Sequence, residues 1–415
     1  MVLDMIRVKG GSPLRGTIRI HGAKNDALPI LAATAAIRGR FILHNCPAIL
    51  DIEIMRRILR ELQISTVRRG SDLLVDSTQM QYAPVSPGLG GRLRASVLFL
   101  GALLASCGEA EIPSPGGDCF GQRPINYHID AMRALGAVPE DGGRFRAAGG
   151  RLHGATVELP FPSVGATENI LLAAVGADRP VRLIGAAREP EIESLAAFLT
   201  ACGAEIRGIG TSCLTVHPGQ RHGAEHTILP DRMETATYLC AAAATGGRIR
   251  LANTLPQLCA PVLAALRAAG CEVRTAEHTI TISAERLHAI PPIVTAPYPG
   301  FPTDAQPLLT AALLRAEGVT VIEERVFDSR FRHIPALISM GADLETAGSL
   351  LKIRGVSRLH GAEAEVTDLR GGAAMLIAAL AAEGESLLTN TRVLERGYEA
   401  LAANLRSLGA EIAEA

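Results

Sequence analysis

Apolar residues along the chain gather in alanine- and leucine-rich stretches that recur at a nearly constant interval. Each stretch is typical of a helix, ends on a glycine and leads into a short apolar run typical of a strand. The closing glycines follow one another at 66 to 71 residues, and they are Gly39, Gly108, Gly176, Gly247, Gly318 and Gly384. This periodicity predicts six α/β units of about 68 residues each.

A second helix-like segment in each unit also ends on a glycine before a strand-like run. Its glycines are spaced at 67 to 71 residues, and they are Gly136, Gly203, Gly270, Gly341 and Gly409. The first copy carries Gln63 in place of the glycine. Glycine suits the residue after a last helical turn because it enters the left-handed conformation without steric cost. Two coincident periods argue against chance similarity, and six units predict two domains of three.

The repeated helices also predict where the sheets lie. The stretch 373–380, Ala-Ala-Met-Leu-Ile-Ala-Ala-Leu, is apolar on every face, and such a helix belongs inside a domain. One unit is too small to bury it, so neighbouring units must pack together. The sequence therefore predicts an α/β fold with internal helices and external sheets.

Composition narrows the functional classes. The 41 basic and 42 acidic residues leave a net charge of −1, which disfavours a general polyanion binder. Tryptophan is absent and aromatic residues make up 3%, which disfavours a base-stacking nucleic-acid platform. We find no signal peptide and no apolar stretch of membrane-spanning length, and the eight cysteines form no close pair. These features predict a cytoplasmic protein with reduced thiols and with no metal, nucleic-acid or membrane partner.

Lysine is scarce, with three among the 41 basic residues. One of them, Lys24, lies in His21-Gly-Ala-Lys-Asn-Asp26, between a strand near 17–20 and a helix expected from about Ala27. A glycine, an ammonium and the Asn25 amide at a helix N-terminus favour an anion site. A surface turn with a solvated lysine is the alternative.

The segment 114–124 holds three glycines, two prolines, a carboxylate, a thiol and a guanidinium: Asp118, Cys119 and Arg123. Such a loop is ordered but mobile and suits a lid that carries an acid, whereas a structural turn is the alternative. The second half of the chain adds charged turns before helices, in which an aspartate is usually an N-cap and an arginine a paired charge. Together, arginines at the same place in several units could bind a phosphate and a carboxylate.

These motifs resemble the UDP-N-acetylglucosamine enolpyruvyl transferase family. The resemblance runs essentially end to end, and its motifs are Gly22–Asn25, Arg94–Ser96, Arg123–Pro124, Ser163–Thr167, Ala187–Ile192, Leu229–Arg232, Phe301–Asp304, Thr367–Arg370 and Arg396–Glu399.

The resemblance implies two inside-out α/β barrel domains of three repeats each. The first comprises residues 22–229 and carries the glycine-rich lid; the second comprises residues 1–21 plus 230–415, with the active site in the cleft between them. The implied reaction moves enolpyruvate from phosphoenolpyruvate to the 3-hydroxyl of UDP-N-acetylglucosamine with loss of phosphate, in peptidoglycan precursor synthesis. The resemblance implies a monomer that uses no cofactor and no metal.

The resemblance also implies site residues, four of which are catalytic: Asp118, Lys24, Asp304 and Arg396. The implied phosphoenolpyruvate ligands are Lys24, Asn25, Arg94, Arg123 and Arg396. The implied UDP-sugar ligands are Arg94, Arg123, Pro124, Ile125, Asn126, Tyr127, Ser163, Val164, Asp304 and Val326. Arg330, Asp368 and Arg370 fall on other charged positions of the family's cleft.

Two positions depart from the family pattern. The usual loop cysteine is replaced by Asp118, with Cys119 one place later, and Asn126 stands where an aspartate faces the uracil end. We expect Asp118 to be the general acid, Asp304 the base for the sugar hydroxyl, and the protein to resist fosfomycin. Three alternatives remain: a transferase for shikimate 3-phosphate, one for another nucleotide or sugar nucleotide in secondary metabolism, and a silent UDP-sugar-binding paralogue.

Overall fold

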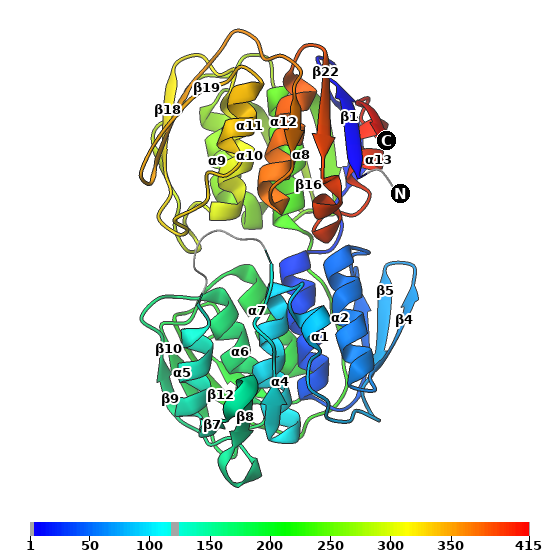
Figure 1. The fold of residues 1–415 in the computed structure, drawn as a ribbon, viewed down its shortest axis with the longest axis vertical. Coiled ribbons are helices and arrows are strands. Elements are labelled where there is room, and N and C mark those ends of the chain that lie inside the picture. Colours follow the sequence, from blue (N-terminus) through cyan, green and yellow to red (C-terminus); the bar gives the residue numbers. More distant parts are fainter. Residues whose placement is uncertain (1–3, 118–123, 415) are drawn as a thin grey trace. The chain divides into compact units, whose positions relative to one another are not determined.

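The structure is a computed structural model, which describes residues 4–117 and 124–414. The chain forms two compact units (Figure 1). The first unit contains residues 22–117 and 124–229, and the second contains residues 4–21 and 230–414. Each unit has its own hydrophobic core.

The first unit packs its internal helices between three sheets. The internal helices are α1 (Lys24–Ala36), α4 (Leu98–Cys107) and α6 (Val164–Ala174). The other helices are α2 (Leu50–Glu61), α3 (Pro87–Gly90), α5 (Asn126–Ala134), α7 (Pro190–Ala201), and the 3₁₀ turns η1 (Arg94–Val97), η2 (Asp141–Gly143) and η3 (Ala148–Gly150). In spatial order the sheets are β13 (Glu225–Thr227), β3 (Arg40–His44), β5 (Asp72–Asp76), β4 (Ser65–Arg69); β6 (Glu109–Glu111), β8 (Arg144–Ala147), β7 (Ala137–Pro139); and β11 (Glu205–Arg207), β12 (Cys213–His217), β10 (Val181–Ile184), β9 (Thr156–Glu158).

The second unit repeats this plan. Its internal helices are α8 (Arg232–Ala244), α10 (Gln306–Leu313) and α12 (Leu369–Ala381). Its other helices are α9 (Ala260–Ala268), α11 (Ile334–Ser339), α13 (Leu401–Ser407), η4 (Pro256–Cys259), η5 (Thr303–Ala305) and η6 (Thr391–Arg396). Its sheets are β15 (Glu272–Ala276), β16 (Thr279–Ser283), β14 (Arg248–Ala252), β2 (Arg15–Arg19); β17 (Ile293–Val294), β18 (Val319–Glu323), β20 (Leu350–Arg354), β19 (Asp343–Ala347); and β21 (Glu363–Glu365), β22 (Glu385–Thr389), β1 (Met5–Lys9), β23 (Glu411–Glu414). Figure 1 shows α10 and α12 between the strands β18–β19 and β22–β1.

Strand pairing explains why the chain passes between the units at residues 21–22 and 229–230. In three repeats an internal helix joins two parallel neighbours: α6 joins β9 to β10, α10 joins β17 to β18, and α12 joins β21 to β22. At the crossovers the leading strands are exchanged: β2 precedes α1 but pairs with β14, and β13 precedes α8 but pairs with β3. Each of these two strands therefore stays in the unit that the chain is leaving, and the helix that follows it belongs to the other unit.

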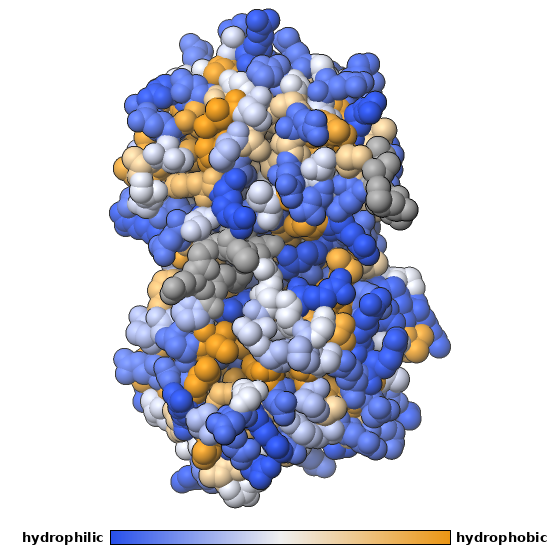
Figure 2. All heavy atoms as spheres, viewed as in Figure 1, coloured by the Kyte–Doolittle hydropathy of each residue, from blue (hydrophilic) through white to orange (hydrophobic). Residues whose placement is uncertain are grey.

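The internal helices are buried on every face. All 13 residues of α12 are buried, and so are all residues of α8 except Arg232. The fold class is confirmed: the apolar repeats predicted an α/β fold with internal helices and external sheets, and the family resemblance implied two inside-out α/β barrels. Figure 2 shows a visible face that is mostly hydrophilic, as expected when the apolar residues point inward.

The expectation that each closing glycine takes the left-handed conformation after its helix is wrong for three of the six. Gly108, Gly318 and Gly384 do adopt positive φ. Gly39, Gly176 and Gly247 do not, and glycine stands there because another segment comes too close for a side chain. A Cβ on Gly176, for example, would lie 2.4 Å from the Cα atom of Ala105.

None of the helices in the described ranges is long and apolar enough to cross a bilayer. The seven cysteines within these ranges carry no disulfide; Cys119 lies outside them.

Gln63 keeps the conformation for which the other five repeats use glycine. Its φ is 58°, and the equivalent Gly136 and Gly203 have φ values of 87° and 101°. A non-glycine residue pays about 1 kcal/mol in this region. We expect Gln63→Gly to raise the free energy of unfolding by about 0.5–1 kcal/mol in a urea titration. Gln63→Ala is the matched control and should give no gain; equal stabilisation by both variants would contradict the explanation.

Candidate active site

The internal helices of both units begin at residues singled out from the sequence. In the first unit α1 starts at Lys24, η1 before α4 starts at Arg94, and α6 is capped by Ser163. In the second unit Asp304 lies in η5 before α10, and Asp368 caps α12. Because the repeats are equivalent, the same end of each internal helix carries the chemistry. Helix N-termini favour anions.

Lys24 is held by a carboxylate that the sequence analysis did not select. Its Nζ lies 2.5 Å from Asp51 Oδ2, and both residues are buried. Asp51 belongs to the first turn of α2. Asp51 shares a helix face with Ile54, Met55 and Ile58, and an acid on that otherwise apolar face was the signal that could have revealed it. Asn25, the next residue of α1, is exposed.

Arg94 lies close to both described ends of the glycine-rich segment. Its Nη2 donates to the carbonyl of Pro124 at 3.3 Å. On the other side, a Cβ on Gly117 would lie 3.0 Å from the Cβ of Arg94, and a Cβ on Gly116 would lie 1.8 Å from the Gly91 oxygen. The three predicted residues between these ends, Asp118, Cys119 and Arg123, lie outside the described residues.

The predicted UDP-sugar residues of the first unit meet around His128. Ile125 precedes α5, which begins with Asn126 and Tyr127, and His128 Nδ1 lies 3.0 Å from the Asn169 side-chain amide of α6. Burial, with a contribution from the positive Arg94, lowers the pKa of His128 to about 4, so the ring is neutral at pH 7.

Asn169 fixes the orientation of that ring. Its Oδ1 accepts from the Gly101 amide at 2.7 Å, so its Nδ2 faces and donates to His128. The Nε2 of His128 therefore carries the proton, and it lies near the start of α6, beside Gly165. Ser163 caps this helix through the Ala166 amide, and Val164 is its first residue. The sequence analysis missed His128 and Asn169 because their contact joins two repeats.

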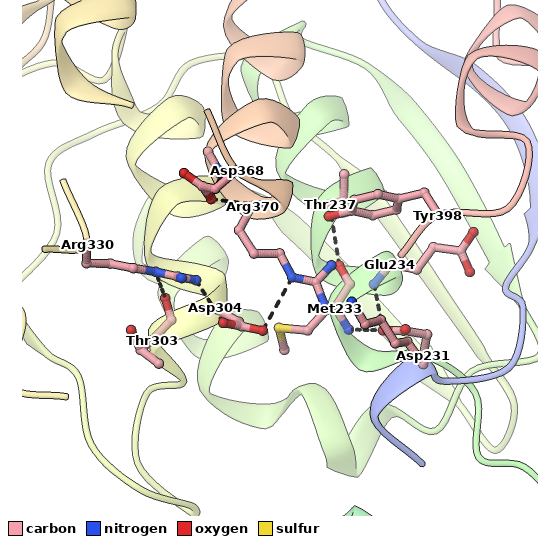
Figure 3. A network of polar contacts seen from close by, with 12 residues as sticks. Asp231, Met233, Glu234, Thr237, Thr303, Asp304, Arg330, Asp368, Arg370 and Tyr398 are labelled. Carbon is pink, nitrogen blue, oxygen red and sulfur yellow. Dashed lines mark hydrogen bonds and ion pairs between the residues drawn. The ribbon is translucent and has the colours of Figure 1, made fainter. Parts of the chain in front are cut away.

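In the second unit two arginines hold Asp304 from different sides (Figure 3). Arg330 Nη2 lies 2.8 Å from Asp304 Oδ1, and Arg370 Nε lies 3.3 Å from Asp304 Oδ2. Both arginines are buried, whereas the Asp304 side chain is 31% exposed. Burial acts to raise the pKa of Asp304, but the two guanidinium groups outweigh it and hold this pKa well below its usual range. Asp304 is therefore an ionised carboxylate that keeps a face to solvent.

Glu324 links the Val326 segment to the turn that carries Asp304. Its carboxylate accepts from Thr303 Oγ1 at 2.9 Å and from the Val326 amide at 2.8 Å. Thr303 and Asp304 are neighbours in η5, so the two predicted UDP-sugar residues Asp304 and Val326 share one support. Glu324 was not selected from the sequence.

Two acids of the charged turns cap internal helices. Asp368 caps α12 and accepts from the amides of Arg370 and Gly371 at 3.1 and 2.8 Å. Asp231 caps α8 in the same way. This is the N-cap alternative that the charged turns left open. Arg396 ends η6, and its neighbour Tyr398 packs against Arg370.

The first unit also buries two acids, Asp26 and Glu168, to which the sequence analysis gave no role. Asp26 is fully buried in the first turn of α1, and its Oδ2 accepts from the Leu229 amide at 2.7 Å. Burial, opposed by that hydrogen bond and reinforced by Glu191, raises the pKa of Asp26 to about 7. Burial and the charges of Glu191, Glu189 and Asp26 raise the pKa of Glu168 well above its usual range. Within the described ranges, no group of three or more His, Cys, Asp or Glu residues could hold a metal ion.

The chain matches the family EPSP synthase (3-phosphoshikimate 1-carboxyvinyltransferase) over residues 8–405. It is 41% identical over 413 residues to UDP-N-acetylglucosamine 1-carboxyvinyltransferase 2 of Caldanaerobacter subterraneus subsp. tengcongensis, and 43% identical over 416 residues to UDP-N-acetylglucosamine 1-carboxyvinyltransferase of Granulibacter bethesdensis. Each match covers 99% of both chains.

Solved structures agree with this match. The enolpyruvyl transferase NikO from Streptomyces tendae superposes with a TM-score of 0.90 at 26% identity, covering 100% of this chain and 99% of that one. An EPSP synthase from Acinetobacter baumannii gives a TM-score of 0.76 at 18% identity, covers 99% of both chains and shows the fold alone.

The chain therefore belongs to the EPSP synthase family and is a carboxyvinyl (enolpyruvyl) transferase. Its resemblance to the UDP-N-acetylglucosamine enolpyruvyl transferases, inferred from the motifs, is confirmed by full-length relatives that carry that name.

The raised pKa of Asp26 predicts how stability depends on pH. Below about pH 4 the carboxyl is protonated in the folded and the unfolded chain alike. Between pH 4 and 7 the unfolded chain loses the proton while the folded chain keeps it, so the free energy of unfolding falls as pH rises and levels off above pH 7. In Asp26→Asn the side-chain oxygen can still accept from the Leu229 amide, and the fall in the free energy of unfolding with rising pH is removed. The variant's stability advantage should grow by about 2–4 kcal/mol between pH 4 and pH 8 in urea titrations.

Asp76→Asn is the matched control for Asp26→Asn. Hydrogen bonds from Thr78 lower the pKa of exposed Asp76, so its contribution is lost as pH falls rather than as it rises. Parallel stability curves for the native protein and Asp26→Asn would show that the buried acid does not control the pH dependence.

Proposed function

We propose that this enzyme transfers the enolpyruvyl group of phosphoenolpyruvate to the 3-hydroxyl of UDP-N-acetylglucosamine and releases phosphate. The observation that carries the proposal is the full-length match, at 40–43% identity, to relatives named for this substrate. NikO, at 26% identity, is a more distant neighbour. Lys24, Asp304 and Arg396 are all present, which argues against a catalytically silent paralogue.

The two units are proposed to share one active site. Phosphoenolpyruvate carries a phosphate and a carboxylate, so its ligands are proposed to be cationic or amide groups at helix starts: Lys24, Asn25, Arg94, Arg123 and Arg396. The UDP-sugar is proposed to lie along Arg123–Tyr127, Ser163–Val164, Asp304 and Val326. The neutral His128, with its Nε2 proton beside the start of α6, adds a further donor to that surface.

The reaction requires one proton to be added and another removed. In the addition step Asp118 gives a proton to the methylene carbon, the sugar oxygen bonds to C2, and Asp304 accepts the hydroxyl proton. A weakly basic carboxylate suffices because the hydroxyl becomes strongly acidic as its oxygen bonds to carbon. In the elimination step ionised Asp118 takes a proton back from the new methyl group, Asp304 returns its proton to the departing phosphate, the C2–O bond to phosphate breaks, and the double bond forms again. Lys24 and the arginines stabilise the departing phosphate.

This function places the enzyme at the first committed step of peptidoglycan precursor synthesis. We propose that it acts in the cytoplasm as a monomer, in support of cell wall biogenesis, cell shape and division. No cofactor or metal has a part in the proposed steps.

The direct test is to mix the protein with phosphoenolpyruvate and a panel of nucleotide sugars, and to measure phosphate release and product mass. We expect UDP-N-acetylglucosamine to gain the mass of one enolpyruvyl group and to outpace every other acceptor. Lys24→Ala should abolish turnover because the ammonium binds the substrate anion. It should also lower the melting temperature because Asp51 loses this buried ion pair, so its activity is measured below the variant's own melting transition. Preference for shikimate 3-phosphate or for another nucleotide sugar would refute the proposal, and so would full activity of folded Lys24→Ala.

The loop sequence predicts resistance to fosfomycin. This antibiotic alkylates a thiolate, and a carboxylate at position 118 is a much poorer nucleophile towards an epoxide. The native enzyme should keep its activity under fosfomycin, and Asp118→Cys should become sensitive. Asp118→Asn cannot donate a proton and should lose about 10²–10⁴-fold in kcat. The matched control Cys119→Ser should be nearly silent. A stoichiometric adduct on Cys119, seen by intact-mass spectrometry with concurrent inactivation, would assign the site to Cys119 instead.

A further inference from the structure

Tyr398 is a buried aromatic residue that lies against the Asp304 cluster without touching Asp304 in any described contact. Its ring centroid lies 5.4 Å from the central guanidinium carbon of Arg370. Its hydroxyl lies 2.8 Å from Thr237 Oγ1 on α8. Tyr398 is 3% exposed, so solvent does not compete for these contacts. Figure 3 shows the phenol beside Thr237, on the far side of Arg370 from Asp304.

Arg370 needs such a support because its side chain is long and flexible. Its backbone is fixed by the Asp368 cap, and Nε reaches Asp304 Oδ2 at 3.3 Å. Between these two points the described contact of the guanidinium is the face of Tyr398. A buried cation over an aromatic face is attracted to the ring and loses freedom to swing away. Arg370 Nη1 is buried with no hydrogen-bond acceptor among the described residues, so the position of the guanidinium depends on Asp304, on the ring and hydroxyl of Tyr398, and on the charge of Asp231.

Thr237 fixes the Tyr398 ring to helix α8. Its hydroxyl donates to the Met233 carbonyl one turn earlier in α8 at 2.8 Å. The Tyr398 hydroxyl is then the donor to Thr237, since a hydroxyl has a single proton. A contact therefore runs from the buried helix α8 through Thr237, Tyr398 and Arg370 to the carboxylate.

Tyr398 is also fixed to the Arg396 turn. Its amide donates to the Leu394 carbonyl at 3.0 Å. The intervening Gly397 packs so closely on the start of α12 that a Cβ there would lie 2.6 Å from a methyl group of Leu369. Arg396 and Arg370, from different segments of the second unit, thus share one support.

We propose that Tyr398 is a positioning residue, which holds the Arg370 guanidinium against Asp304 through its ring and its hydrogen bond to Thr237. The consequence for catalysis rests on the proposed function, in which Asp304 receives the sugar hydroxyl proton. The consequence for Asp304 itself does not, because it concerns the protein without substrate.

The test follows the ionisation of Asp304 directly, by carboxyl ¹³C NMR of protein labelled at aspartate, with the signal assigned from Asp304→Asn. In the native protein the Asp304 signal should stay ionised to the lowest pH at which the fold persists. In Tyr398→Leu, Arg370 is held less firmly against Asp304, so the pKa of Asp304 should rise. Arg330, 2.8 Å away, should still keep that pKa below the ordinary aspartate value. The same variant should lose about tenfold or more in kcat while KM for phosphoenolpyruvate changes less.

Tyr238→Leu is the matched control, because it removes another fully buried tyrosine of the same unit with no described contact to Arg370. It should leave the Asp304 titration unchanged. An unchanged Asp304 titration in folded Tyr398→Leu would overturn the proposal, as would an equal change in Tyr238→Leu.

Two less disruptive variants test the proposal if Tyr398→Leu does not fold. Tyr398→Phe and Thr237→Val each remove one end of the same hydrogen bond and leave the ring in place. Each should shift the Asp304 titration slightly. The double variant should shift it no further than Tyr398→Phe alone, because that change also removes the interaction of the hydroxyl with Arg370. No shift in either variant, or fully additive shifts, would overturn the proposal. A native protein that shows the Asp304 behaviour but no turnover with UDP-N-acetylglucosamine would refute the proposed function alone.

Discussion

The need to bury helices that are apolar on every face governs the rest of this structure. A helix such as α12, with all 13 residues buried, cannot lie on a surface, and one repeat of about 68 residues cannot enclose it. Three repeats can, because each contributes a sheet that covers the helices of its neighbours. Once the helices are packed in this way, only their ends reach the outside of the unit. Chemistry is therefore confined to helix starts, where Lys24, Arg94, Asp304 and Arg370 are found.

Burying charged groups at those helix starts removes their hydration, and the two units compensate for this loss in different ways. In the first unit Lys24 lies against Asp51, so a single opposite charge offsets the loss of hydration. In the second unit Asp304 lies between two arginines, Arg330 and Arg370, and Asp231 adds a further negative charge near Arg370. Asp26 and Glu168 have no comparable cation in the described contacts, and the protein accommodates them by favouring their neutral forms.

Periodicity predicted the architecture because packing imposes the same pattern on every repeat. It gave six units, the internal helices and the departure at Gln63, which the backbone shows to be a left-handed residue like the glycines of the other repeats. It did not reveal why Gly176 is glycine, since the cause is a close approach of Ala105 from another repeat. Lys24 was selected because lysine is rare here, yet its partner Asp51 was not. Pairs such as His128 with Asn169 form only through tertiary packing, which a single sequence does not encode locally.

The two proton-transfer groups in the proposed reaction place opposite demands on the protein. The proposed base is already in its reactive, ionised form in the free protein, because Arg330 and Arg370 keep Asp304 ionised before any substrate arrives. Tyr398 and Thr237 are proposed to hold that arrangement. An acid cannot be built in the same way, because a free aspartic acid with a pKa of ~3.9 is almost fully ionised at pH 7 and nearby arginines favour the charged form. The phosphate and carboxylate of the substrate supply the opposing negative charge, so an acid on Asp118 becomes competent only when substrate is bound. The proposed acid belongs to the glycine-rich segment, whose described ends lie close to Arg94, whereas the proposed base is set in the packed helix ends. The proposal therefore separates the group that must respond to substrate from the group that must not.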